Sequence, residues 1–435
     1  MPGLDANQHA GARLRPRATH RKAAVQMTGS AGPRTHEAVQ RRVVRVLAVG
    51  QILSGVGTGA AVSTGALLVA DVAGSSAWSG MASTANTLGA AMAAVPLAIL
   101  AQRRGRRPSL TGGAVLAAAG AALVVVGAGL SAAPLVIAAM VVMGTGTALS
   151  FQARFAATDL STDATRGRDL SLVVWATTVG AVAGPNLTTL SDGLAHALGL
   201  PALTGGFAIA ALVQLAGASV YFAGLRPDPL AVVGLNELSG RATEPRRRGG
   251  AWRVLVSNAG ARQAVLAVSS SHAVMVALMS MTPVHLTDHG GSLTSVGVTI
   301  SLHIAGMFAL SPIFGLLVDR LGCTRVILLG RGLLLLALTT AALGSHERAL
   351  VTVSLVLLGL GWSAATVAGS TLVSKAVDPS HRTSVQGTSD LLMNLAGAAG
   401  GAMAGPILAQ FGFAGLAVVL IALVAGVTVG RRRPA

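Results

Sequence analysis

The sequence predicts an all-α polytopic membrane protein: twelve transmembrane helices in two parallel six-helix repeats, with both termini cytoplasmic. Three observations predict this fold class: long uncharged apolar runs, basic residues confined to alternate loops, and short motifs that occur once in each half. The 435 residues are 52% hydrophobic and only 11% charged, whereas soluble domains carry about 25% charged residues. The apolar runs are as long as a membrane-crossing helix and lack the alternation of a barrel strand, so helices are predicted.

Twelve apolar runs are long enough to cross a bilayer. Their expected bounds are 46–70, 78–101, 109–130, 133–156, 170–194, 202–225, 261–284, 293–318, 324–345, 349–374, 384–409 and 411–430. Residues 1–45 are polar and basic and have no apolar stretch before a small-residue cleavage site, so no cleavable signal peptide is predicted. Met27 is an alternative start of translation within this segment.

The basic residues predict the orientation of these spans. All but one of the 32 Lys and Arg residues fall in the two tails or in and near the loops after the even-numbered spans, and only Arg348 falls on the other side. Positive charge favours the cytoplasmic side, which predicts cytoplasmic termini and a place in the cell membrane. The net charge of +17 also suggests nucleic acid, but residues 1–45 have no interleaved aromatic residues and no nucleic-acid motif. Attraction to anionic lipid is the preferred interpretation.

A polar segment divides the spans into two sets of six. The predicted organisation is a basic tail (1–45), an N-terminal bundle (46–225), a linker (226–260), a C-terminal bundle (261–430) and a short basic tail (431–435). Three landmarks recur at nearly one spacing: AILAQRRGRRP (98–108) with GLLVDRLGCTR (315–325), GTG (144–146) with GLG (359–361), and GAVAGP (180–185) with GAMAGP (401–406). Parallel repeats of this kind are one known plan of transporter.

With these motifs the whole chain resembles a major facilitator superfamily transporter. That family carries G-x-x-x-D-R-x-G-R-R between its second and third helices, often repeated between the eighth and ninth. The second copy here matches at Gly315, Asp319, Arg320 and Gly322, with Arg325 one place late, and the first copy matches at Arg103, Gly105, Arg106 and Arg107. The copies depart from the pattern at Ala98, Gln102, Cys323 and Thr324. The resemblance implies a twelve-helix fold that acts as a monomer and moves a small-molecule substrate together with protons.

Two further signatures bear on the kind of transport. The motif G-x-x-x-G-P-x-x-G-G, found in the fifth helix of the family's antiporters, matches at Gly180, Gly184 and Pro185 but not at Thr188 and Thr189. A second antiporter marker, an arginine in the fourth helix, is replaced by methionine at position 140. The motifs are closest to those of drug:proton antiporters, which implies proton-coupled export of a lipophilic small molecule. A proton-coupled uptake symporter for a small metabolite and a non-transporting membrane receptor on the same fold are the alternatives.

The residue types of the repeated loop have physical roles. Gly105 and Gly322 suit a short turn with positive φ. The arginines can bind a carboxylate such as Asp159, and Asp319 is expected to face the positive N-terminus of a neighbouring helix. Such contacts would hold the cytoplasmic side closed and release it when the halves move. The alternative is a topology anchor with no gating role.

Small residues four apart let helix backbones touch, and a proline after them bends the helix. The fifth and eleventh spans both have this pattern, at Gly180, Gly184 and Pro185 and at Gly401, Gly405 and Pro406. The interpretation is a packing surface, which can also be the surface on which the halves move.

The resemblance implies that helices 1, 4, 7 and 10 line a central cavity. Their candidate cavity residues share helix faces and are Gln51, Thr58, Met140, Thr147, Phe151, Arg154, Met275, Met279, Trp362 and Thr366. A cavity of this composition is apolar and thinly charged, which favours a lipophilic substrate, and methionine surfaces adapt to varied partners. Ordinary helix packing is the alternative for each residue.

Ionisable groups inside a membrane are costly and are usually functional. The candidates for carrying protons are His272, His303, Asp390 and Asp71, in that order for the first three. Histidine titrates near neutral pH. The alternative is a neutral, hydrogen-bonded histidine or a carboxylate at the membrane interface.

Other chemistries are not indicated. His285 and His289 lie four apart beside Asp288, but the Gly290–Gly291 pair that follows suggests a helix end rather than a zinc site. The chain has no GxxxxGK[ST] sequence for ATP and no nucleophile–base–acid set. A secondary transporter without a cofactor, and not an enzyme, is therefore predicted.

Overall fold

The structure is a computed structural model that describes residues 33–74, 78, 81–183, 187–237, 250–290 and 293–429. Every regular element in these ranges is a helix, which confirms the all-α class there. Residues Gln40–Ala435 form one compact unit. Most of the predicted N-terminal tail, the middle of the linker, the C-terminal tail, and Gly184 and Pro185 lie outside the described residues.

In the first half of the chain, the described residues form eight helices. They are α2 (Pro33–Ala73), α3 (Met81–Arg104), α4 (Arg106–Gly129), α5 (Ala133–Met143), α6 (Thr145–Ala156), α7 (Arg166–Ala183), α8 (Thr188–Ala197) and α9 (Gly205–Gly224). The turn between α3 and α4 is one residue long because Gly105 adopts φ 99°, which only glycine accepts readily. Arg103 and Arg104 in the last turn of α3 suit the negative end of the helix dipole.

The linker and the second half complete the fold. Their helices are α10 (Pro229–Glu237), α11 (Gly250–Ser257), α12 (Ala259–Asp288), α13 (Leu293–Phe308), α14 (Ser311–Leu321), α15 (Cys323–Leu343), α16 (Arg348–Ala376) and α17 (Pro379–Val429). The turn between α14 and α15 repeats that between α3 and α4, since Gly322 adopts φ 87°. The positive φ expected at both glycines is therefore confirmed.

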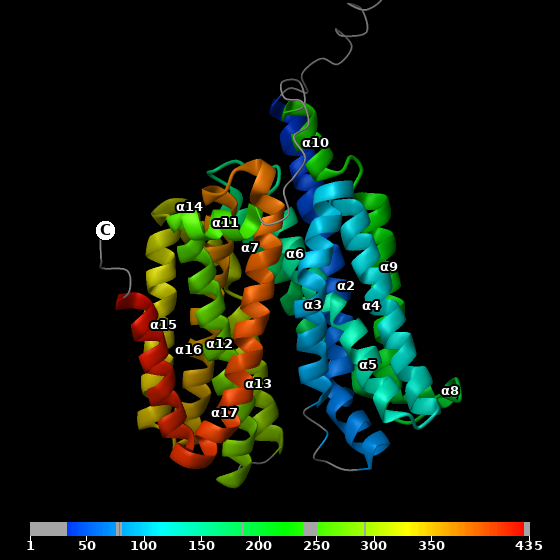
Figure 1. Cartoon of the computed structure of the whole chain (residues 1–435). Helices are drawn as coiled ribbons and strands as arrows, with labels where there is room; N and C mark the ends of the chain where they lie inside the picture. The colour runs from blue at the N-terminus through cyan, green and yellow to red at the C-terminus, as the bar shows by residue number, and fades with distance from the viewer. Residues whose placement is uncertain are drawn as a thin grey trace, which may run out of the picture. The chain divides into compact units, whose positions relative to one another are not determined.

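Ten helical segments of the described chain are long and apolar enough to cross a membrane. The expected span 170–194 is not among them, and its described residues lie in α7 and α8, on either side of positions 184–186, which the structure does not describe. The expected spans 384–409 and 411–430 are joined in α17, where Gly412 breaks the helix with φ 67° and ψ −177°. Figure 1 shows the two parts of α17 running in opposite directions. Twelve crossings therefore stay a prediction.

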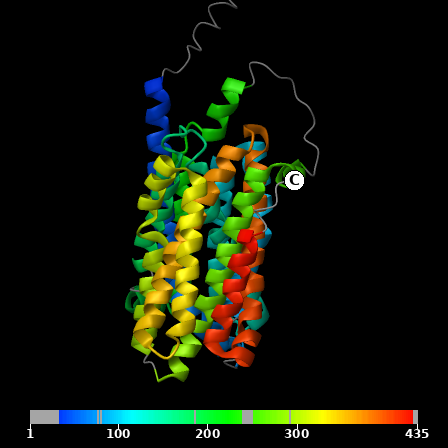
Figure 2. The ribbon, with the colours of Figure 1, turned by 90° about the vertical axis from the view of Figure 1, so that its left-hand side faces the viewer.

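Within the compact unit the long helices run along one common direction, as Figures 1 and 2 show. Each half has its own core: Leu68, Val136 and Phe207 lie in the core of the first half, and Leu334 and Leu355 in that of the second. Two further clusters contain residues of both halves. One joins α7 to α14 and α15, and the other joins α6 to α11, α12, α16 and α17.

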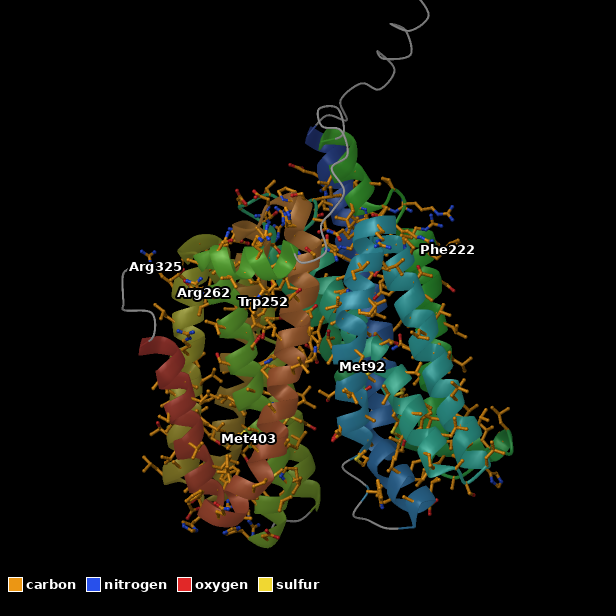
Figure 3. All side chains as sticks on the ribbon, viewed as in Figure 1. Met92, Phe222, Trp252, Arg262, Arg325 and Met403 are labelled. Carbon is orange, nitrogen blue, oxygen red and sulfur yellow. The ribbon has the colours of Figure 1, made fainter. Side chains whose placement is uncertain are left out.

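The outer surface is apolar along the long helices. Met92 on α3, Leu212 on α9 and Met403 on α17 are each 62% exposed, and Figure 3 shows Met92 and Met403 on the outside of their helices. Apolar side chains exposed in such numbers would be a liability in water. They are expected where a helix bundle faces lipid tails.

The predicted glycine packing differs between the two halves. A methyl group on Gly180 would collide with the backbone of Ile52 and lie 2.5 Å from the nitrogen of Val56, so α7 touches α2 there. A methyl group on Gly405 would meet nothing within 4 Å, so the packing expected at Gly405 is wrong. The contact with α12 is made on earlier turns of α17, where added methyl groups on Gly397 and Gly400 would lie 2.5 Å from His272 and Ala273.

At the neighbouring positions of α17, Gly401 packs closely against α12, since its added methyl group would lie 3.3 Å from Val276. Pro406 lies inside α17, but the helix continues through it and is broken at Gly412 instead. A proline can be accommodated within an apolar helix because neighbouring helices and side chains satisfy the backbone carbonyl that loses its hydrogen bond.

Candidate functional site

The turns at Gly105 and Gly322 lie at one end of the compact unit, together with the ends of α6 and α16 and the starts of α7 and α17. This end is called the basic end below. Among the described residues, three groups of hydrogen bonds that involve side chains extend between the halves. Two lie at this end, around Arg106 and Asp319, and one lies deeper in the bundle, around Arg154.

The first group is a buried ion pair that extends across the halves. Arg106, the first residue of α4, donates from Nε to Oδ2 of Asp159 at 2.8 Å and from its terminal nitrogen to Oδ1 at 3.1 Å. The two side chains are 1% and 2% exposed. The same terminal nitrogen donates to Oε1 of Gln386 on α17 at 2.7 Å. A bidentate pair of this kind is fixed in geometry as well as in energy, so Arg106 ties α4, the end of α6 and α17 together.

Hydroxyl groups continue this network. Gln386 donates from Nε2 to Oγ of Ser374 at 3.3 Å, and Thr158 donates to the same oxygen at 3.1 Å. Lys375, next to Ser374, donates to the carbonyl of Asp163 at 3.0 Å. The C-terminal end of α16 is therefore held to the segment that joins α6 and α7.

The second group is centred on Asp319. Its two carboxylate oxygens accept hydrogen bonds from the backbone nitrogens of Gly167 and Arg168, each at 2.8 Å. These nitrogens belong to the first turn of α7, so the carboxylate lies at the positive end of the helix dipole, as the sequence analysis expected. Gly315, one turn earlier on α14, allows this approach: a methyl group there would lie 2.6 Å from the carbonyl oxygen of Gly167.

Among the described residues, the first copy of the loop motif has no carboxylate contact across the halves like that of Asp319. Position 102 is glutamine instead of aspartate, and the start of α4 is capped by Asp228 of the linker, which accepts from the backbone nitrogen of Arg107 at 2.7 Å. Arg107 also donates to the carbonyl of Phe222 at 2.8 Å and lies 4.2 Å from the centre of its ring. Figure 3 marks Phe222 near the end of α9.

The remaining arginines of the motif point away from these contacts. Arg103 and Arg320 are exposed and have no hydrogen bond or ion pair with any described residue. Arg325, marked in Figure 3, reaches only the carbonyl of Leu321 in the preceding helix, at 3.5 Å. The structure thus brings Arg106, Asp159 and Asp319 into buried or inter-helix contacts and leaves these three arginines on the surface.

The third group is an ion pair between the halves. Arg154 on α6 donates to Oδ1 of Asp390 on α17, and the side chains are 2% and 0% exposed. The guanidinium carbon of Arg154 also lies 4.9 Å and 5.0 Å from the ring centres of Phe151 and Phe155. Within the described chain, Nε of Arg154 and Oδ2 of Asp390 have no hydrogen-bond partner. Both residues are candidates from the sequence, Arg154 for the cavity and Asp390 for proton transfer.

Aromatic side chains lie beside this pair. Phe151 of the first half meets His272 of the second edge-on, with ring centres 6.2 Å apart. Trp362 on α16 donates from its indole nitrogen to Nδ1 of His272 at 3.0 Å, and Phe308 packs edge-on against Trp362 at 5.7 Å. Because Nδ1 accepts a hydrogen bond, His272 is held as the neutral tautomer with its proton on Nε2.

The other proton-transfer candidates lie elsewhere. His303 on α13 is fully buried, and its Nδ1 lies 2.7 Å from the carbonyl oxygen of Leu355 on α16. Asp71 is exposed near the end of α2, away from the basic end. Neither residue contacts the Arg154–Asp390 pair.

Most cavity candidates are packed against neighbouring helices. Met140 and Met275 lie in the cores of the first and second halves, where they contact other apolar side chains instead of an open cavity, and Met279 packs against the second core. Thr366 is 1% exposed and its hydroxyl has no partner among the described residues. In this conformation Met140 packs with Leu68 and Phe207, and Met275 belongs to the same core as Leu278, so their role as cavity residues stays a prediction.

The polar candidates of the first half bond within it. Gln51 donates to the carbonyl of Ser150 at 3.2 Å and to Thr177 at 3.3 Å. Thr147 accepts from Asn86 at 3.1 Å, and Thr58 lines a small internal space beside Asn86. These residues join α2 and α3 to α6 and α7.

Several contact residues were not found from the sequence. Gln386, Met393 and Phe308 join the groups above but belong to no motif. The one available signal was the position of Gln386 four residues before Asp390 on α17, because residues at that spacing share a helix face. Met393 lies 3.8 Å from the terminal nitrogen of Arg154 through its sulfur.

Comparison with known proteins identifies the family. The model of the Major Facilitator Superfamily matches residues 47–400 and also 264–435. The chain is 36% identical over 388 residues to the protein of Bacillus subtilis named Uncharacterized MFS-type transporter YdeG, covering 89% of this chain and 90% of that protein. It is 28% identical over 368 residues to the Riboflavin transporter RfnT of Brucella anthropi, covering 82% and 87%.

Solved structures share the fold. The proton:xylose symporter XylE superposes with a TM-score of 0.73 at 14% identity, over 91% of this chain and 95% of that one. The human organic anion transporter MFSD10 superposes with a TM-score of 0.71 at 16% identity, over 90% and 99%. The match of the family model over most of the chain, together with the Bacillus subtilis relative, shows that the chain belongs to the major facilitator superfamily of multi-pass membrane transporters.

Proposed function

We propose that this protein is a proton-coupled secondary transporter that exports a lipophilic small molecule by alternating access, with Asp390 as the group that carries the proton. The buried pair of Arg154 and Asp390, one residue from each half, is the observation that carries the proposal. Charge buried at this depth is costly and is usually retained for function.

The pair supports coupling because its strength depends on the charge of Asp390. As a carboxylate, Asp390 holds α17 to α6 through Arg154. Protonation neutralises the carboxyl group, and Oδ2, which has no hydrogen-bond partner in the described chain, can accept the proton without breaking another bond. Arg154 then lacks a counter-charge, and a buried pair broken in this way costs about 3–5 kcal/mol. Proton binding at Asp390 therefore favours separation of the halves at the basic end.

The surroundings of the pair support a lipophilic substrate. Phe151, His272, Trp362 and Met393 supply apolar and aromatic surface, and the only formal charges in the group cancel each other. A substrate with several charges would find no compensation there. One proton crossing about 100 mV releases roughly 2.3 kcal/mol, which sustains a gradient of order tenfold to a hundredfold for a neutral molecule.

The proposal includes the topology and location predicted from the sequence. The basic end faces the cytoplasm, both termini lie there, and twelve helices cross the cell membrane with the chain acting as a monomer. The asymmetry of the basic residues supports this orientation. In the conformation described here, the contacts of Arg106, Asp319 and Arg154 close the cytoplasmic side.

Uptake in symport with protons is the second candidate. It is favoured by Thr188 and Thr189, which replace the two final glycines of the antiporter signature. The relative in Brucella anthropi is named a riboflavin transporter, so an aromatic heterocyclic metabolite is the substrate class to test for this candidate. The same Arg154–Asp390 pair would couple the proton in either direction.

Proton movement in everted membrane vesicles tests the proposal. Vesicles with an acidic interior would be given lipophilic compounds one at a time, and proton release would be followed with a fluorescent probe. Release that depends on the compound and is absent from Asp390→Asn vesicles is expected. If no compound releases protons, while riboflavin or another heterocycle is taken up by cells with the gradient, the uptake candidate replaces export.

A further inference from the structure

The short helix α11 exposes an apolar face at the basic end. Figure 1 shows it lying across the direction of the long helices, just before α12 begins. Trp252 and Val256, four residues apart and therefore on one helix face, are 62% and 58% exposed. Leu266, one turn further along α12 than Arg262, continues this apolar surface and is 49% exposed.

Arginines border the apolar face. Arg253 on α11 and Arg262 on α12 are both exposed, and Figure 3 marks Trp252 and Arg262 close to α11. Neither arginine forms an ion pair with any residue the structure describes, and Arg262 bonds only to the carbonyl of Val256 at 2.7 Å. The two arginines have no carboxylate partner and lie next to an exposed tryptophan. Their positive charge complements the negative charge of a phosphate group.

The opposite side of α11 packs on both halves of the protein. Leu255 is 5% exposed and belongs to a cluster with Phe155 of α6 and Val385 of α17. Phe155 follows Arg154 in the chain, and Val385 precedes Gln386. The helix is thus fixed against the residues that close the basic end, with its apolar face and arginines directed outward.

We propose that α11 and the start of α12 form a docking surface for anionic phospholipid. Trp252 and Val256 lie at the boundary between headgroups and acyl chains, as tryptophan commonly does in membrane proteins. Arg253 and Arg262 bind the phosphate and the negatively charged headgroup. A helix that crosses the bundle direction, with apolar side chains facing out and arginines beside them, has the features of a helix lying in the membrane interface.

Tryptophan quenching by brominated lipids tests the proposal on the full-length protein. The protein would be placed in phosphatidylcholine nanodiscs that contain increasing fractions of brominated phosphatidylglycerol or brominated phosphatidylcholine. The contribution of Trp252 is the difference between the wild type and Trp252→Phe. Trp78, which is 48% exposed and lies between α2 and α3, supplies the matched control as Trp78→Phe.

The arginines are tested with matched charge changes. Arg253→Gln and Arg262→Gln each remove one cation from the surface, while Arg325→Gln removes one from α15 at the same end. Trp252 is expected to be quenched at a lower fraction of brominated phosphatidylglycerol than of brominated phosphatidylcholine. The fraction of brominated phosphatidylglycerol needed for the same quenching of Trp252 should rise about fivefold in Arg253→Gln and in Arg262→Gln. It should not change in Arg325→Gln.

Three results would overturn the proposed docking surface. Equal quenching of Trp252 by the two lipids, or an equal effect of Arg325→Gln, would overturn the proposal, because either result means that general charge or general lipid contact is sufficient. No quenching of Trp252 by either lipid would overturn it too, since α11 would then lie outside the membrane interface. The measurement does not involve transport, so it is independent of the proposed function.

Discussion

Arg154 and Asp390 are separated by 236 positions in the chain, yet their side chains form a buried ion pair that joins α6 to α17. A pair of this kind connects the two halves at one point deep in the bundle, where water cannot screen it. Its two members have unequal roles in the proposed mechanism, because a carboxyl group can lose its charge by binding a proton, whereas a guanidinium group stays charged.

The first prediction concerns Asp390. Asp390→Asn keeps the size of the side chain but leaves the charge of Arg154 without a partner, which costs about 3–5 kcal/mol for a buried pair. We expect proton release coupled to substrate to fall at least about tenfold in everted vesicles. The matched control is Asp71→Asn, which changes an exposed carboxylate and should behave like the wild type.

A folding defect in Asp390→Asn is distinguished with a second variant. Arg154→Gln combined with Asp390→Asn removes both charges together, and replacing both members of a buried pair is tolerated far better than replacing one. This variant should reach the membrane in normal amounts and still lack proton coupling. Normal coupling in it would show that the pair does not carry the proton.

The second prediction uses the single cysteine of the chain as a reporter of the basic end. Cys323 is 7% exposed and packs with Leu170 of α7 and Val318 of α14. Asp319→Asn removes the charge that faces the first turn of α7, which weakens the contact by about 1 kcal/mol. The rate of alkylation of Cys323 by a permeant maleimide should therefore rise about fivefold.

Arg320→Ala is the control for that measurement. Arg320 is adjacent to Asp319 and belongs to the same motif, but it is exposed and contacts no described residue through a hydrogen bond or ion pair. Its replacement should leave the rate of alkylation unchanged. An equal increase in both variants would mean that the motif acts through its charge in general and not through the contact with α7.

The third prediction compares two glycines, Gly180 and Gly405, that belong to the same repeated motif. Gly180→Ala places a methyl group against the backbone of Ile52 and Val56, and overpacking of this kind costs about 1–3 kcal/mol. Gly405→Ala places its methyl group in open space and should be neutral. The melting temperature in detergent, followed by tryptophan fluorescence, should fall only in Gly180→Ala; equal melting temperatures would contradict the contact between α7 and α2.

The fourth prediction concerns the histidines. His272 accepts a hydrogen bond from Trp362, and His303 lies against the carbonyl of Leu355 on α16, so both have fixed structural partners. In the His303→Ala variant we expect proton coupling to persist, with a loss of stability from the buried cavity. His272→Ala should weaken substrate binding, because the ring lies between Phe151 and Trp362, and should leave the proton dependence intact.

These two variants would be measured for both substrate affinity and proton release. Loss of proton release in either one, at saturating substrate and with normal amounts of protein in the membrane, would assign the proton to a histidine and remove Asp390 from that role.

The loop motifs show how far sequence reasoning reaches. Glycine at positions 105 and 322 predicts positive φ because other residues are strained there, and the structure agrees. The partner of Asp319 could also be anticipated as a class, a helix N-terminus, because a carboxylate is stabilised there. The sequence could not identify which helix that is, since α7 lies about 150 residues earlier and no local pattern connects the two.

The arginines of the first motif show a feature that the sequence could not predict. The arginines at 103, 106 and 107 are equivalent in the sequence pattern, but only Arg106 is buried against Asp159 and Gln386. Which arginine turns inward depends on the direction of each side chain at the start of α4. That direction is set by the position of α17, which packs against α3 and contributes Gln386.

The sequence alone determined the membrane-spanning helical class, the family, and the residue types of the loops, because apolar length, charge asymmetry and glycine turns are local properties of a chain in lipid. The tertiary structure alone decided which polar residues meet. It paired Arg154 with Asp390, placed Met140 and Met275 in packed cores, and left open space where a side chain at position 405 would lie. The physical reason is that helix packing brings together residues from distant parts of the chain, and the identity of those neighbours decides whether a side chain is paired, packed or exposed.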